Sequence, residues 1–182
     1  LSMGDGWGES VALSADGNVL AVTASGGSYV RVLALDASST TQLWVPKGQV
    51  LNVGNDPRTS KLSARMSVSL SANGNIVAFG VPEVDGGKGS LSGLVQVYRF
   101  DETAEEWSLL GQNLPGSQAN EQFGFSLALS SDGLTLVASG VGNDGTGEDA
   151  ALGVVRIFQF DESSDAWEQV TDDIEGEAPG DE

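Results

Sequence analysis

The sequence contains neither cysteine nor histidine among its 182 residues. Without cysteine, a disulfide framework, a thiolate metal site and a cysteine nucleophile are all excluded. Without histidine, the commonest general base, the usual zinc ligand and the Ser-His-Asp triad are excluded as well. No apolar run approaches the roughly 20 residues that cross a bilayer, so we expect no membrane insertion.

Basic residues are also scarce, with 8 Lys and Arg against 26 Asp and Glu and a formal charge of −18. A field of this sign repels phosphate backbones, so nucleic acid is not an expected partner. The same acidity suits a marine or calcium-rich medium, and it equally serves ordinary solubility.

The hydrophobic content and the placement of glycine and proline favour an all-β fold. The chain is 40% hydrophobic, enough for a sizeable core, and its 25 glycines and 5 prolines lie between the apolar runs. Short strands joined by tight turns need this distribution. The chain starts at Leu1 rather than at Met, and we interpret it as a piece of something longer.

One motif occurs three times: SVALSADGNVLAVTA from Ser10, SVSLSANGNIVAFGV from Ser67 and SLALSSDGLTLVASGV from Ser126. The glycines at the centre of the motif, Gly17, Gly74 and Gly133, are 57 and 59 residues apart. A near-constant period indicates a repeat architecture. We predict three repeats, 1–64, 65–122 and 123–182, of which the first is the most divergent.

The third repeat predicts four strands. Residues 125–130 alternate large and small side chains, the period of a half-buried strand, and Ser131-Asp132-Gly133 is typical of a tight hairpin turn. Further strands are expected at 134–138, 154–160 and 166–170. Each repeat is therefore predicted to form one antiparallel four-stranded sheet.

Four-stranded sheets that repeat at this length favour β-propeller blades. The sequence also resembles the FG-GAP repeats of integrin-like propellers and of large secreted proteins of marine microbes and algae. Phe123-Gly124 matches the FG of that family, and Phe79-Gly80-Val81-Pro82 stands close to its GAP. The resemblance implies a propeller at the cell surface or outside the cell.

Propellers close with about four to eight blades, and this chain supplies three. We therefore expect the remaining blades to come from further sequence, from a second copy or from an open array. Self-association follows as a prediction, because two uncovered sheet faces would be apolar.

A calcium site is one interpretation of the glycine-rich loop 142–149. Its Asn143, Asp144, Glu148 and Asp149 offer the hard oxygen ligands that Ca²⁺ prefers. The FG-GAP resemblance implies calcium in such a loop, although the spacing departs from the family pattern. The alternative is a solvated acidic turn. No other cofactor is expected.

The aromatic and serine residues that recur in each repeat have structural interpretations. Trp44, Trp107 and Trp167 occur once per repeat after an acidic turn, and we expect them, like Trp7 and Phe123, to pack between sheets. Ser14, Ser71 and Ser130 each adjoin a turn, where hydroxyls cap backbone amides. No catalytic constellation is unique to one place, so we expect a protein that is not an enzyme.

Two functions remain open. In the first, the chain is an extracellular adhesion or ligand-binding module whose rim loops meet a protein or polysaccharide. In the second, it is a structural subunit of a filament or sheath in which repeats stack between chains.

Overall fold

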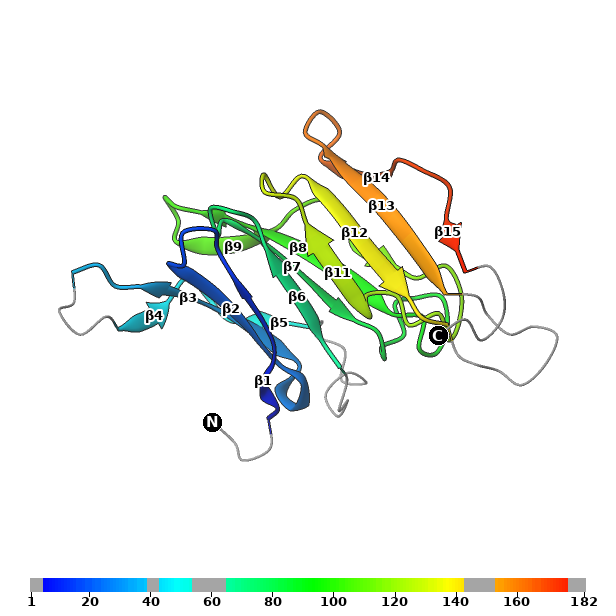
Figure 1. Ribbon diagram of the computed structural model, residues 1–182, viewed down its shortest axis with the longest axis horizontal. Coiled ribbons are helices and arrows are strands. Elements are labelled where there is room, and N and C mark those ends of the chain that lie inside the picture. Colours follow the sequence, from blue (N-terminus) through cyan, green and yellow to red (C-terminus); the bar gives the residue numbers. More distant parts are fainter. Residues whose placement is uncertain (1–4, 39–42, 54–64, 143–152, 177–182) are drawn as a thin grey trace.

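The computed structural model describes residues 5–38, 43–53, 65–142 and 153–176, and within them the chain forms three antiparallel sheets (Figure 1). The first sheet contains β1 (Trp7–Leu13), β2 (Val19–Ala24), β3 (Tyr29–Leu35), β4 (Trp44–Pro46) and β5 (Leu51–Asn52), with a short 3-10 helix at Ser25–Gly27. The second contains β6 (Ser67–Leu70), β7 (Ile76–Val81), β8 (Leu94–Asp101), β9 (Glu106–Leu109) and β10 (Leu114–Pro115). The third contains β11 (Ser126–Leu129), β12 (Thr135–Gly140), β13 (Val154–Asp161), β14 (Ala166–Gln169) and β15 (Ile174–Glu175).

The strand order within each sheet follows the sequence, and the outer strand is split in two. Both β14 and β15 pair with β13, and the second and first sheets repeat this arrangement with β9 and β10 on β8 and with β4 and β5 on β3. The predicted all-β fold of propeller-type, four-stranded blades is confirmed. The short segments β5, β10 and β15 were not predicted, because two residues carry no readable periodicity.

The hydrophobic core lies between the sheets. Along β7, alternate side chains point in opposite directions: Val77 and Phe79 pack against the first sheet, whereas Ile76 and Ala78 pack against the third. The second sheet is therefore buried on both faces. We call the contact between the first and second sheets the first joint, and that between the second and third sheets the second joint.

The inner edges of the sheets lie side by side. β1 contacts β6, and β6 contacts β11 (Figure 1). The Ala15 N–H donates to the Ala72 carbonyl at 2.9 Å, and the Ala72 N–H donates to the Ser131 carbonyl at 2.8 Å. Sheets stacked face to face around adjoining inner edges are the arrangement of propeller blades.

The serines of the repeated motif hold the first hairpin of each sheet. Ser130 Oγ accepts the Thr135 N–H at 3.0 Å and donates to Asp132, whose carboxylate accepts the Leu134 N–H at 2.9 Å. Ser14 and Ser71 make the same bonds in their own turns. The predicted turn role of these serines is confirmed.

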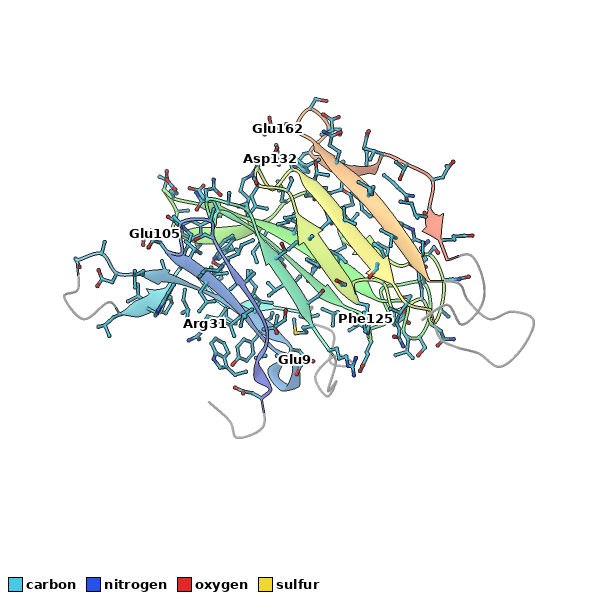
Figure 2. The ribbon with its side chains drawn as sticks, viewed as in Figure 1. Glu9, Arg31, Glu105, Phe125, Asp132 and Glu162 are labelled. Carbon is cyan, nitrogen blue, oxygen red and sulfur yellow. The ribbon has the colours of Figure 1, made fainter. Side chains whose placement is uncertain are left out.

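The two ends of the sheets differ. At one end lie the hairpin turns 14–18, 71–75 and 130–134, and we call it the turn rim; Figure 2 labels Glu105, Asp132 and Glu162 there. At the other end lie the connections 25–28, 82–93 and 116–125, which we call the loop rim. Loop-rim segments bond to one another, as in the Asn120 N–H to Ser90 carbonyl bond of 2.9 Å.

In the described part of the chain, no helix has the length and apolarity needed to cross a membrane.

The predicted packing of the aromatic residues is confirmed inside the joints and wrong outside them. Trp107, Trp167 and Phe123 are buried, at 4%, 3% and 0% exposure. Trp44 and Trp7 are exposed, at 40% and 41%. Both lie in the first sheet, where the second sheet covers only the opposite face.

Candidate functional site

A buried group of charged side chains lies where the third sheet reaches the loop rim, and its centre is Arg156. Because β13 alternates, Arg156 shares a face with Phe158 and Phe160 and points toward the second sheet. Its guanidinium lies over the ring of buried Phe123, 5.1 Å from the ring centroid. Arg156 was not predicted as a site residue, because it lies within an apolar strand and lacks a recognisable motif.

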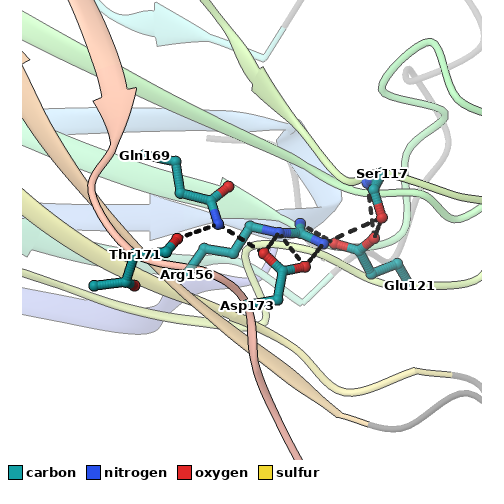
Figure 3. Close-up of polar contacts among 6 residues, drawn as sticks. All are labelled: Ser117, Glu121, Arg156, Gln169, Thr171 and Asp173. Carbon is teal, nitrogen blue, oxygen red and sulfur yellow. Dashed lines mark hydrogen bonds and ion pairs between the residues drawn. The ribbon is translucent and has the colours of Figure 1, made fainter.

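Two carboxylates neutralise Arg156 (Figure 3). Its Nε lies 3.0 Å from both oxygens of Asp173, and its Nη2 lies 2.8 Å from Asp173 Oδ2. Its Nη1 pairs with Glu121, which is 3% exposed. Asp173 comes from the segment between β14 and β15, and Glu121 from the connection that enters the third sheet.

Ser117 connects this network to the second sheet. The backbone N–H and the hydroxyl of Ser117 donate to Glu121 Oε2 at 2.7 and 2.6 Å, and Arg156 Nη2 donates to Ser117 Oγ at 3.1 Å. The group therefore fixes the loop 116–125 against the third sheet. A buried charge is stabilised only by such pairing.

The electrostatics keep the group ionised. Burial opposes the charge of Arg156, but hydrogen bonds and ion pairs with Asp173 and Glu121 outweigh that effect and raise its pKa above the ordinary value. The bonds from Arg156 hold the pKa of Asp173 below its ordinary 3.8. Asp173 is thus suited to accepting hydrogen bonds rather than to transferring protons near neutral pH.

A cavity of about 320 Å³ opens beside Arg156, lined by Ser117, Gln118, Glu121, Val154, Arg156, Asp173 and Glu175. Because Arg156 is engaged by its two carboxylates, the polar groups left for a ligand belong mainly to Gln118 and Glu175. The Glu175 carboxylate accepts hydrogen bonds, and the Gln118 side-chain amide both accepts and donates them. Such groups suit a ligand with hydroxyl or ammonium groups.

A larger cavity of about 570 Å³ lies at the turn rim. Its charged lining residues are Arg99, Asp101 and Glu102. All three form exposed contacts: Arg99 lies 3.7 Å from Glu162, Glu102 accepts a bond from Asn75, and Asp101 accepts the N–H groups of its own turn. We therefore take the Arg156 cavity as the better candidate for ligand binding.

The predicted calcium ligands Asn143, Asp144, Glu148 and Asp149 lie outside the described residues. The corresponding loop of the second sheet is described, and Asp85 there accepts the N–H groups of Gly87 and Gly89 at 2.8 and 3.1 Å. That carboxylate therefore caps a turn. Among the described residues, no group of three or more acidic side chains is placed to hold a metal ion.

Comparison with solved structures places the fold among β-propellers of several kinds. Over 96% of its length the chain is similar to 40% of a putative 6-phosphogluconolactonase from Bacteroides fragilis, at 14% identity and a TM-score of 0.62. Over 98% it is similar to 38% of Sqt1 from Saccharomyces cerevisiae, at 13% identity and a TM-score of 0.56. Over 94% it is similar to 40% of the periplasmic gluconolactonase PpgL from Pseudomonas aeruginosa, at 15% identity and a TM-score of 0.53.

The chain spans about two fifths of the length of these structures. No protein-family model and no curated protein matches it. The interpretation as an FG-GAP repeat protein is therefore wrong, because the propellers that the chain is similar to are of other kinds. Its FG and GAP-like dipeptides have a local explanation, since Gly80 and Gly124 pack backbone to backbone between neighbouring sheets.

The prediction that the chain is not an enzyme is contradicted as well, because two of these three propellers carry the names of lactonases. The prediction rested on missing histidine and cysteine and on marked residues that recur in every repeat. Neither observation excludes chemistry built from rim loops on this fold.

Proposed function

We propose that the chain is a segment of an extracellular β-propeller that binds a protein or polysaccharide at its loop rim. The observation that carries this proposal is the carboxylate-lined cavity beside Arg156, at the point where the connections of the second and third sheets meet. An extracellular location is supported by the periplasmic lactonase among the similar propellers and by the strong acidity of the chain.

The chemistry of the cavity favours a ligand rich in hydroxyl or ammonium groups. Gln118 and Glu175 offer accessible acceptors, while the ion pairs of Arg156 keep the surrounding backbone in place. Sugars present the hydroxyls and basic protein segments present the ammonium groups that such acceptors bind. Calcium binding by Asn143, Asp144, Glu148 and Asp149 remains part of this proposal on ligand chemistry alone.

A structural role between chains is the second candidate, and the two outer sheet faces favour it. Val11 and Leu13 are 61% and 58% exposed, whereas Val68 and Leu70, at the same repeat positions, are 8% and 9% exposed within the first joint. Exposed apolar faces of this kind are typical of interaction surfaces. Further sheets from the same or other chains would cover them.

Titration calorimetry against neutral, acidic and amino polysaccharides and against a basic peptide tests the rim proposal, with and without Ca²⁺. We expect binding to one class, weakened about tenfold when Glu175→Gln removes a charged acceptor. Glu105→Gln on the turn rim is the matched control and should leave binding unchanged. An equal loss in both variants, or no heat with any ligand, would contradict the proposal.

A further inference from the structure

The two joints are held by the same hydrogen-bonded staple. In the first joint, Trp107 Nε1 donates to the Lys47 carbonyl at 2.7 Å, and the side-chain amide of Gln49 bonds to both the N–H and the carbonyl of Trp107, at 2.8 and 2.6 Å. In the second joint, Trp167 Nε1 donates to the Leu110 carbonyl at 2.9 Å, and Gln112 bonds to the N–H and the carbonyl of Trp167, at 2.9 and 2.7 Å.

A glycine directly before each glutamine makes room for the tryptophan. Gly48 and Gly111 have φ values of +72° and +70°, in the left-handed region that favours glycine. A Cβ at Gly48 would lie 2.7 Å from Trp107 Cδ1, and one at Gly111 would lie 2.9 Å from Trp167 Cδ1. Each joint therefore requires a Gly–Gln pair on one sheet and a tryptophan on the next.

The first sheet presents the receiving half of this staple on its uncovered face, which we call the first end face and define by Val11, Leu13, Gly17 and Trp44. Trp44 pairs with Leu35 in the register in which Trp107 pairs with Phe100 and Trp167 with Phe160. A Cβ at Gly17 would meet only Leu13 Cδ2, at 4.0 Å. At the equivalent Gly74, a Cβ would meet Val19 of the preceding sheet at 2.5 Å.

The third sheet does not present the matching half. Its uncovered face, the last end face, is defined by Val170, Thr171, Asp172 and Ile174. Thr171 and Asp172 occupy the positions of the Gly–Gln pair, four and five residues after the tryptophan of their sheet. Thr171 carries a Cβ where the staple leaves no room for one. The carboxylate of Asp172 can accept an N–H but has no amide to donate to a carbonyl.

We propose that the first end face binds a propeller sheet that carries a Gly–Gln pair between the two segments of its outer strand, and that the last end face of a second copy is not that partner. This inference rests on the proposal that further sheets cover the end faces. It identifies the partner by chemistry: a glycine in the left-handed region followed by glutamine, with an apolar surface facing Val11 and Leu13. Ring closure or stacking of identical copies through this joint is correspondingly weak.

Grafting the missing pair onto the last end face tests the inference with the full chain. We expect Thr171→Gly combined with Asp172→Gln to strengthen self-association about tenfold or more over the wild type in sedimentation velocity, since two hydrogen bonds form and a clash is removed. Iodide quenching of tryptophan fluorescence should fall in parallel as Trp44 becomes covered.

Two controls distinguish association through the staple from non-specific association. Thr171→Ala combined with Asp172→Asn changes the same positions without creating the pair and should match the wild type. Adding Trp44→Ala to the graft should return the average mass seen in sedimentation velocity to that of the wild type. If the grafted chain loses its circular dichroism signal, the same requirement is tested in the first joint, where Gln49→Asp removes the amide that donates to the Trp107 carbonyl and should lower the urea midpoint. An unchanged midpoint overturns the inference.

The inference is also overturned if the graft changes neither the sedimentation mass nor the iodide quenching of tryptophan fluorescence. It is overturned as well if wild-type chains already associate in a way that shields Trp44 from iodide. Ligand titration at the loop rim of the same variants keeps the two proposals apart. Rim binding is expected to be the same in all of them, so its absence would remove the rim function alone.

Discussion

The second sheet and the two outer sheets share one repeat but differ in how much of it is enclosed. Leu110 and Leu114 of the second sheet are buried by the third, whereas Val170 and Ile174, at the same positions of the third sheet, are exposed. The same holds for Trp107 against Trp44. A repeat specifies which side chains point toward a neighbour, and the neighbour determines whether they are buried.

Removing equivalent tryptophans tests most directly how much the neighbouring sheet contributes to stability. We expect Trp107→Ala to cost about 3–5 kcal/mol of unfolding free energy, because it empties a packed joint and leaves the Lys47 carbonyl without its donor. Trp44→Ala should cost about 1 kcal/mol or less, since that ring is half in solvent. Urea unfolding monitored by circular dichroism measures both, and equal costs would show that burial does not distinguish the two sites.

The next largest difference in unfolding free energy is expected between variants of Arg156 and Arg99. Arg156→Gln is expected to cost about 3 kcal/mol, because it leaves the Glu121 carboxylate buried without its counter-charge. Arg99→Gln is the matched control, since its pairing with Glu162 is exposed, and should cost about 1 kcal/mol or less.

Adding Glu121→Gln to Arg156→Gln should recover part of the loss, because a neutral amide replaces the buried carboxylate that had lost its counter-charge. A further loss in the double variant would rule out an uncompensated charge as the cause.

Periodicity and turn residues were enough to predict the fold class, the hairpins and the buried Trp107, because a period of two and Ser-x-Asp/Asn-Gly turns are local signals. The split outer strand and the Arg156 group were not predictable in this way. Arg156 meets Glu121 and Asp173 only because three segments separated in sequence converge at one end of the third sheet. Trp44 was predicted wrongly because local sequence does not show whether a neighbouring sheet is present.

A third test compares glycines at one repeat position. Gly74→Ala is expected to cost about 3 kcal/mol, because it combines a left-handed backbone with a collision against Val19. Gly17→Ala shares the backbone conformation but faces open space, so about 1 kcal/mol is expected. Denaturant midpoints in a common buffer measure the difference. Similar losses in both variants would mean that packing between sheets at this turn contributes little.

The smallest expected effect is a difference in acid sensitivity between the turns. Hydrogen bonds from Ser14 and from the Asn18 backbone lower the pKa of Asp16 below 3.8, and bonds from Ser130 and the Leu134 backbone do the same for Asp132. The second sheet has the non-titrating Asn73 at this position, where it accepts equivalent bonds from Ser71 and from the Asn75 backbone.

Because the folded-state pKa values of Asp16 and Asp132 are depressed, their contribution to stability is present at neutral pH and is lost as the pH falls below about 4 through those values. Asp16→Asn combined with Asp132→Asn makes the outer turns resemble the middle one. We expect its urea midpoint to decline less between about pH 6 and about pH 3 than that of the wild type, in high salt that screens general repulsion. Parallel declines would show that the turn carboxylates are not linked to folding, and that Asp and Asn hold this turn equally well at every pH.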